Sequence, residues 1–420
     1  MRTSRIMIKE FIKSNLPFLS NFINLGFIQV SNAVIQVLLF PIIFHIIGIK
    51  EFGYVGVANS YAGLVSLLIN YGTNQSGIKD IAINKQNKNK LSNIFYSVYY
   101  TRILLFLISL IALGVLYYIQ VPLLHYFILA NVIIVAEVFN PFFFFVGMEK
   151  LFIFNVANLL SKVSSVLLII FFVTSSSSGS FVNLYLGSGN LVFYLLLTFY
   201  AINRYGLSQY AINSSDIKGL LYKNFFLAGN NLSVQLQQSF FVFTLSGSVN
   251  PLVLGAYTFC DKIVWSFRLM LIAFSSAVYP RAAITYHSKK EDWFLQKRRL
   301  NLILVFVFLT AAAVLFFLAP SVVFLLTKTT DTLTIHYIRC ISLVPLIAAL
   351  NALNVIELLI GNSYSSLFKM GLALMVLSSV NSFLFLRAGV GYFGYYPITM
   401  EICGLLMCLY FTKKQQGQLC

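Results

Sequence analysis

Residues 52–86 read FGYVGVANSYAGLVSLLINYGTNQSGIKDIAINKQ. The part from 52 to 72 carries no charged residue, and the part that follows carries Lys79 and Lys85. A helix needs about 20 predominantly apolar residues to cross a lipid bilayer. We therefore predict that residues 52–72 form a membrane-spanning helix that ends in a basic loop.

The whole chain has the composition of a membrane protein. Its 420 residues are 59% hydrophobic and 10% charged, and its mean hydropathy is +0.84. Soluble domains are about 45–50% apolar and about 25% charged. Backbone polar groups in lipid must be satisfied within the spanning segment, which favours helices. We predict an all-α membrane protein with about 12 transmembrane helices, at residues 20–44, 52–72, 94–118, 121–147, 151–173, 181–203, 224–247, 252–279, 299–318, 333–360, 365–386 and 390–411.

The pattern is least regular at 319–350, where Pro320, Asp331 and Pro345 interrupt it. The distribution of Lys and Arg gives the orientation. Most of them fall in loops on one predicted side, and the other side carries only Lys50, Lys328 and Arg387. The side rich in Lys and Arg faces the cytoplasm.

We therefore expect a multi-pass protein of the bacterial inner (cytoplasmic) membrane with both termini in the cytoplasm. The net charge of +17 is assigned to topology and lipid contact, with no nucleic-acid partner. Arg102 is expected to snorkel from the cytoplasmic end of its helix.

The chain contains an internal similarity. Residues 254–289 read LGAYTFCDKIVWSFRLMLIAFSSAVYPRAAITYHSK, and without gaps Gly53 aligns with Gly255 and Lys79 with Arg281. Both segments begin on the same side, which indicates a parallel repeat about an axis along the membrane normal. We predict two six-helix lobes around a central cavity, at residues 1–203 and 224–420, joined by a cytoplasmic linker at 204–223. Chance similarity between apolar helices is the alternative.

Polar residues within the spans recur at helical spacing, so that each of several helices presents one polar face. A water-filled cavity would explain these faces, and hydrogen bonding between helices in a dry bundle is the alternative. For contact with sugar hydroxyls we single out the amide side chains Asn32, Gln36, Asn155, Asn158, Gln235 and Gln238.

Charged residues within spans are costly and mark functional positions. Arg and Lys suit a phosphate group, so we assign an anionic head group to Lys162, Lys262, Arg268 and Arg339. A buried carboxylate can take up a proton and couple transport to an ion gradient, and the candidates are Glu137, Asp261 and Glu357. Glu401 is expected near the membrane interface.

Several chemistries have no signature in the sequence. There is no Walker A motif, no hydrolase or kinase motif set, and the four His residues are isolated. The five Cys residues include no CxxC pair. We therefore expect no enzyme activity, no catalytic residue, no cofactor and no metal site.

Two patches resemble the polysaccharide transporters. GIKEFGYVGVANSYAGLVSLLINYGTNQSGIKDIA (48–82) is similar to the family's early region, where a Gly-x-x-x-[Phe/Tyr]-Gly turn opens the second helix. NPFFFFVGMEKLFIFNVANLLSK (140–162) is similar to the link between the fourth and fifth helices. The layout of the spans extends this resemblance over the full chain, and the motifs identify the superfamily better than the cargo.

The resemblance implies an O-antigen-type flippase of the multidrug/oligosaccharidyl-lipid/polysaccharide exporter superfamily. Such a protein moves undecaprenyl-diphosphate-linked oligosaccharide repeat units across the inner membrane by alternating access, in contact with membrane lipids. A polysaccharide polymerase and a chain-length regulator are its candidate partners. The alternatives are a drug/cation antiporter of the same superfamily and a membrane glycan polymerase, which would need a large periplasmic loop.

Overall fold

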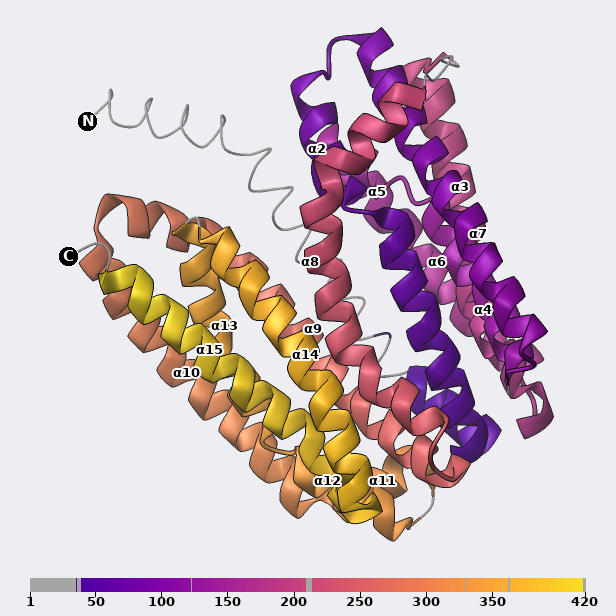
Figure 1. Ribbon diagram of the computed structural model, residues 1–420, viewed down its shortest axis with the longest axis vertical. Helices are drawn as coiled ribbons and strands as arrows, with labels where there is room; N and C mark the ends of the chain where they lie inside the picture. The colour runs from indigo at the N-terminus through magenta and orange to yellow at the C-terminus, as the bar shows by residue number, and fades with distance from the viewer. Residues whose placement is uncertain are drawn as a thin grey trace, which may run out of the picture.

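The protein is helical throughout the part described by the computed structural model, which covers residues 35, 39–121, 123–208, 214–328, 330–361 and 363–417. Within these ranges there is no β-strand. The first predicted span lies mostly outside them, together with Asn32 and Gln36. Figure 1 shows two groups of long helices.

The N-terminal group comprises the helical run 39–70 and the elements that follow it up to Tyr205. These are α2 (Thr73–Ile83), α3 (Lys88–Tyr118), α4 (Leu124–Val138), α5 (Phe142–Gly147), α6 (Leu151–Phe172), the 3-10 turn η1 (Ser176–Phe181) and α7 (Val182–Tyr205). Gly48 divides the first run, because its φ of 77° lies in the left-handed region that glycine adopts without steric cost.

The C-terminal group comprises the elements from Ser214 onward. These are α8 (Ser214–Ser246), α9 (Pro251–Ser288), α10 (Lys290–Phe317), α11 (Ala319–Thr327), α12 (Thr332–Ile341), α13 (Val344–Ile360), α14 (Tyr364–Ala388), η2 (Val390–Tyr395) and α15 (Tyr396–Gly417). The helix α8 begins within the predicted linker, and Asp216 in its first turn complements the positive end of the helix dipole. The predicted lobe boundaries stay a prediction.

Eight helical segments in the described ranges are long and apolar enough to cross a membrane. They are Leu39–Ile83, Lys88–Tyr118, Leu124–Gly147, Leu151–Phe172, Ser176–Tyr205, Lys290–Phe317, Thr332–Ile360 and Ser365–Ala388. The helices α8, α9 and α15 are also long, at 33, 38 and 22 residues, but their polar and charged residues lower their hydropathy. The prediction of an all-α membrane protein is confirmed.

The described part of segment 319–350, where the sequence pattern is least regular, contains the starts of three helices, α11, α12 and α13. Pro320 and Pro345 lie in the first turns of α11 and α13, where proline removes no helical hydrogen bond. The carboxylate of Asp331 caps α12 by accepting the Thr334 backbone N–H at 2.8 Å. These residues therefore interrupt the apolar run because they begin new helices.

Each group packs chiefly within itself. In the N-terminal group α4 and α6 both pack on α7, and α2 packs on α5. In the C-terminal group α14 packs on α8, and α13 packs on α9, α10 and α15. In Figure 1 the groups converge near α11 and α12, and α10, α13 and α15 diverge from the N-terminal group toward the C-terminus. The start of α8 stays beside α2, where Lys223 pairs with Asp80 at 2.8 Å. We call the diverging end, with the loops of Lys85 and Lys289, the basic end, and the opposite end the outer end.

Candidate functional site

The two groups meet at the outer end where the helical run 39–70 crosses α9. A Cβ added to Gly53 would lie 2.8 Å from the Gly255 backbone nitrogen, and a Cβ added to Gly255 would lie 1.9 Å from the Ile49 carbonyl oxygen. A Cβ on Gly56 would lie 3.1 Å from the Thr258 Cβ. Small residues allow such close approach of membrane helices. We call these residues the glycine crossing.

The crossing brings together positions that the sequence repeat aligns. Gly53 aligns with Gly255, and the same register places Gly56 on Thr258. Residues related by a two-fold axis contact each other only where they lie on that axis. The contacts therefore agree with a repeat whose pseudo-two-fold axis passes through the crossing.

One turn further into the membrane, a hydrogen bond joins the two groups. Lys262 Nζ of α9 donates to Asn59 Oδ1 at 3.1 Å, and the ammonium lies 5.3 Å from the centroid of the Phe40 ring. Asn183 of α7 donates to the Val55 carbonyl oxygen at 3.0 Å, which ties the helix of Asn59 to the N-terminal group. The Lys262–Asn59 hydrogen bond is thus a polar contact between the N-terminal and the C-terminal group of helices.

An apolar cavity of about 290 Å³ adjoins Lys262. The 39–70 run contributes Phe40 and Pro41, and α9, α10 and α11 contribute the other walls. Residues of both groups therefore line it. The ammonium of Lys262 lies at an otherwise hydrocarbon surface, where an amphiphile with an anionic head would match both features.

Arg268 lies further along α9 and pairs with Glu401 of α15. Its Nε and Nη2 donate to Glu401 Oε1 at 3.1 and 2.6 Å, and the two side chains are 20% and 14% exposed. Glu401 therefore has an interior partner and does not snorkel toward water, and its expected position near the membrane interface stays a prediction. An Arg has five N–H donors, and among the described residues only these two hydrogen bonds are made, so the guanidinium keeps donors for a ligand.

The amides of α8 fall into the same region in part. A Cβ on Gly63 would lie 3.5 Å from Gln235 Nε2, so Gln235 reaches the helix that carries Asn59. Gln235 also donates to Ser239 Oγ at 3.0 Å. Gln238 is half-buried on α8, and its role stays a prediction.

The polar stripe of α6 lies where α6 packs on α7. Asn155 and Asn158 are 3% and 6% exposed. Ser161 of the same stripe donates to Asn190 Oδ1 at 2.9 Å. This burial agrees better with hydrogen bonding between helices than with a cavity lining. Lys162 is half-buried beside this stripe, and its predicted contact with phosphate stays a prediction.

Glu137 belongs to a polar cluster inside the N-terminal group. Its carboxylate accepts Asn70 Nδ2 at 2.8 Å and Asn140 Nδ2 at 2.9 Å. Arg102 lies in the same cluster and is fully buried. It donates to Thr73 Oγ1 at 2.9 Å and to the Asn140 carbonyl oxygen at 2.7 Å.

The expectation that Arg102 snorkels to the membrane surface is wrong. Further hydrogen bonds reach Asn74 Oδ1 at 3.0 Å and the Glu137 carbonyl oxygen at 3.3 Å, and the guanidinium carbon lies 5.2 Å from the Phe143 ring centroid. Interior partners thus satisfy the cation, so it does not need to reach water. Arg102 links α2, α3 and the α4–α5 turn, which sequence position alone did not indicate.

Glu357 has a structural setting. Its carboxylate is 1% exposed and pairs with Lys297 Nζ of α10 at 2.5 Å. Protonation of Glu357 would leave Lys297, which is 14% exposed, without its counter-ion, and that is costly for a buried pair. We leave Glu357 out of the proposed transport residues.

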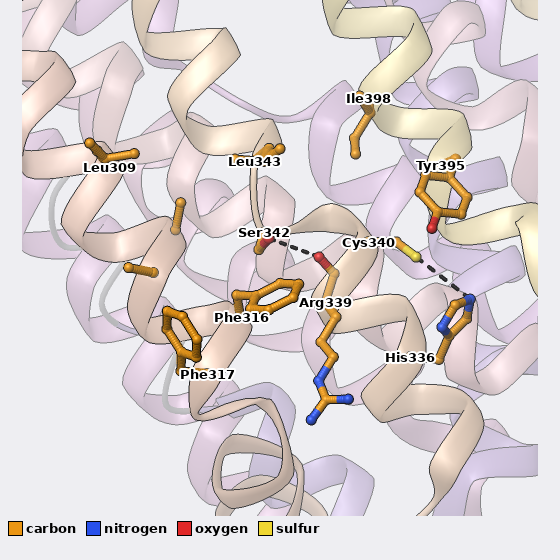
Figure 2. A pocket seen from close by; sticks show the side chains of 12 residues that line it. Leu309, Phe316, Phe317, His336, Arg339, Cys340, Ser342, Leu343, Tyr395 and Ile398 are labelled. Atoms are coloured by element: carbon orange, nitrogen blue, oxygen red, sulfur yellow. Dashed lines mark hydrogen bonds between the residues drawn. The ribbon is translucent and has the colours of Figure 1, made fainter.

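Arg339 lies on another face of the C-terminal group. Figure 2 shows it in a groove between α10, α12 and the start of α15, with its guanidinium directed past Phe316 toward the end of α10. The residue is exposed, and its guanidinium carbon lies 6.0 Å from the Phe316 ring centroid. The groove lining includes neither Lys262 nor Arg268, so the structure separates Arg339 from these cations.

Comparison with known proteins agrees with this geometry. The family described as "Polysaccharide biosynthesis protein" matches residues 18–286. A relative from Escherichia coli (strain K12), described as "Putative O-antigen transporter", is 23% identical over 278 residues, which are 65% of this chain. The aligned region spans 66% of that relative, slightly less than two thirds of its length.

Solved structures of similar fold are transporters. An inward-facing multidrug resistance MATE family transporter of the MOP superfamily gives a TM-score of 0.69 at 14% identity, with 93% of this chain and 99% of that chain covered. A MOP superfamily transporter from Pyrococcus furiosus Vc1 (DSM3638) gives a TM-score of 0.67 at 14% identity, with 95% of each chain covered. An outward-facing multidrug resistance MATE family transporter of the MOP superfamily gives a TM-score of 0.62 at 13% identity, again with 95% of each chain covered.

The family match extends from the first predicted span to the end of α9 and includes the glycine crossing, Lys262 and Arg268. It covers more than half of the chain. The fold of the MOP superfamily transporters extends over nearly all of it. The chain therefore belongs to the polysaccharide biosynthesis protein family and is an integral membrane protein with the fold of the MOP superfamily transporters.

Proposed function

We propose that the protein is a flippase for undecaprenyl-diphosphate-linked oligosaccharide repeat units of the O-antigen type. It would carry them across the bacterial inner membrane by alternating access. The family match and the name of the Escherichia coli relative support this substrate class. The observation that carries the proposal is the pair of cations Lys262 and Arg268 on α9. Lys262 bonds to Asn59 of the N-terminal group, and Arg268 lies further along the same helix, paired with Glu401.

These cations suit a diphosphate. Among the residues that the structure describes, Lys262 makes one side-chain hydrogen bond, to Asn59, although an ammonium has three donors. Arg268 also keeps donors beyond those used by Glu401. A diphosphate could take up the free donors first and then replace Asn59 and Glu401 as the partners of the two cations.

The lipid part of the cargo has its own match. The cavity beside Lys262 is lined by Phe259, Phe267 and Met270 among other apolar residues. An isoprenoid chain in this cavity would place its diphosphate against the ammonium. A water-soluble sugar or a free drug cation would not use both features, since the first lacks the chain and the second repels Lys262.

The way the two groups meet supports the proposal of alternating access. They touch at the glycine crossing at the outer end. Toward the basic end the start of α8 stays on the N-terminal group, where Lys223 pairs with Asp80 at 2.8 Å, while α10, α13 and α15 diverge from that group (Figure 1). We assign this arrangement to the state in which the protein is open to the cytoplasm. The glycine crossing then acts as the closed outer gate, and opening it would separate Gly53 from Gly255.

Coupling to an ion gradient would need a carboxylate that changes its protonation. Asp261 precedes Lys262 on α9, and none of the four ion pairs among the described residues includes it. We propose Asp261 as the first candidate and Glu137 as the second. A transport rate that is insensitive to both the pH gradient and the membrane potential would exclude this coupling.

The remaining assignments belong to the same proposal. Lys162 is a proposed contact with the diphosphate or an anionic sugar, and Gln235 and Gln238 are proposed contacts with sugar hydroxyls. Asn155 and Asn158 are proposed to support α6 against α7. A polysaccharide polymerase and a chain-length regulator are proposed partners. Both termini are placed in the cytoplasm because the basic loops are on that side.

Deletion of the gene tests the function. We expect loss of surface polysaccharide and accumulation of lipid-linked single repeat units on the cytoplasmic side. Complementation with Lys262→Gln should restore less than a tenth of the surface polysaccharide, because a charge-assisted contact contributes about 1.5–3 kcal/mol. The matched control is Lys413→Gln, at an exposed position of α15, which should complement fully.

Two outcomes would contradict the proposal. Full surface polysaccharide in the deletion strain would exclude a required flippase. Changed drug susceptibility with unchanged polysaccharide would favour the drug/cation antiporter instead. The strains complemented with Lys262→Gln and with Lys413→Gln need equal amounts of the protein in the membrane, measured on an epitope-tagged chain.

A further inference from the structure

The groove that contains Arg339 has features that the proposed transport path does not use. It has a volume of about 550 Å³ and lies between α10, α12 and the η2–α15 junction (Figure 2). Its walls are mainly apolar. Leu309, Phe316, Phe317 and Leu343 are 50%, 46%, 75% and 47% exposed. On a membrane-spanning surface such side chains contact lipid, so the groove opens to the bilayer.

Arg339 is a charged group without a counter-ion in this groove. None of the four ion pairs among the described residues includes it. The neighbouring polar groups are engaged elsewhere, since His336 Nε2 lies 2.8 Å from the Gly391 carbonyl oxygen and Cys340 Sγ lies 3.6 Å from the same nitrogen. The ring of Phe316 provides a cation–π contact, which does not neutralise the charge.

The depth of Arg339 corresponds to the region just below the lipid head groups. The segment Thr332–Ile360 has 29 residues and consists of α12 and α13, and α12 lies at the outer end (Figure 1). Arg339 lies about 10 Å along it from the outer end. Its side chain is directed toward the end of α10 (Figure 2), and a long cationic side chain can thereby reach the phosphate layer.

We propose that this groove binds one anionic phospholipid of the outer leaflet. The phosphate pairs with the Arg339 guanidinium, whose planar donors match phosphate oxygens. One acyl chain lies along α10 over Ala312 and Ala313, where small side chains leave room beside Leu309. The proposal does not depend on the transported cargo, because the groove is separate from Lys262 and Arg268.

The test measures lipid binding to the purified full-length protein by native mass spectrometry. The probes are phosphatidylglycerol and phosphatidylcholine with the same acyl chains. We expect Arg339→Gln to weaken phosphatidylglycerol binding by about tenfold, and Arg339→Lys to retain most of it. The matched control is Arg387→Gln, since Arg387 is exposed in the last turn of α14 and lies outside the groove.

A second variant tests the place of the acyl chain. Ala313→Phe keeps the charge of Arg339 but fills the groove, and it should also weaken phosphatidylglycerol binding. Equal melting temperatures of all variants in lipid-free detergent exclude unfolding as the cause. Three results would each overturn the proposal: wild-type binding by Arg339→Gln, wild-type binding by Ala313→Phe, or equal binding of the two lipids by the wild type.

Discussion

Replacing Gly255 by alanine should force the closed outer gate apart. The new Cβ would lie 1.9 Å from the carbonyl oxygen of Ile49 and 2.7 Å from the carbonyl carbon of the same residue. Ordinary contact begins near 3.4 Å, so the two backbones must separate by about 1.5 Å at this point. The closest atoms belong to the backbone, and a change of rotamer therefore cannot relieve the clash.

The cost of this overpacking sets the size of the effect. Extra methyl groups in well-packed positions cost about 1–3 kcal/mol, which corresponds to a shift of about 5–150-fold in a conformational equilibrium. The clash exists only while the outer end is closed. Gly255→Ala should therefore raise the population of molecules in which the outer end is parted and the basic ends have approached each other.

Double electron–electron resonance measures this shift in reconstituted protein. Spin labels on Asn89 of α3 and Lys289 at the end of α9, both exposed, report the distance between the basic ends. The labels should be attached through an unnatural amino acid, because the chain has five cysteines of its own. We expect a new population at shorter distance in Gly255→Ala.

The matched control is Gly247→Ala near the outer end of α8. A Cβ on Gly247 would meet no atom within 4 Å, so this variant should give the wild-type distance distribution. A wild-type distribution in Gly255→Ala as well would refute the assignment of the glycine crossing as a gate. A loss of folded protein would be visible as a lower melting temperature, and Gly53→Ala, with its milder approach of 2.8 Å, then serves as the test.

Three further predictions concern the charged side chains. Glu401→Gln removes one partner of the Arg268–Glu401 pair and should lower the free energy of unfolding by about 2 kcal/mol. The double variant Glu401→Gln with Arg268→Gln should regain this stability but should not transport. If the double variant did transport, a contact between Arg268 and the cargo would be excluded. Arg102→Leu should destabilise the protein by about 3–5 kcal/mol, measured as loss of folded protein in the membrane, and a normal amount would show that the cluster is dispensable. Lys297→Met should lower the melting temperature, and the double variant Lys297→Met with Glu357→Leu should restore it. Equal melting temperatures of the single and the double variant would mean that the Lys297–Glu357 pair does not hold α10 against α13.

The sequence by itself determined the properties that depend on local composition. The apolar runs, their interruption by Pro320 and Pro345, and the sidedness of Lys and Arg follow from transfer to lipid and from backbone chemistry. The repeat also placed Gly53 and Gly255 at equivalent positions. It did not show that the two glycines touch, because equivalent residues meet only if the axis passes through them.

Only the tertiary structure decided which polar side chain meets which. Periodicity gives the residues that share one face of a helix, but it does not give the rotation of that face toward a neighbour. Arg102 proved to be buried, Glu401 to pair with Arg268 and Arg339 to lie in a groove apart from Lys262 and Arg268. The reason is physical: in lipid a cation is stabilised by whichever partner the packing of distant helices brings near, and those partners lie dozens to hundreds of residues away along the chain.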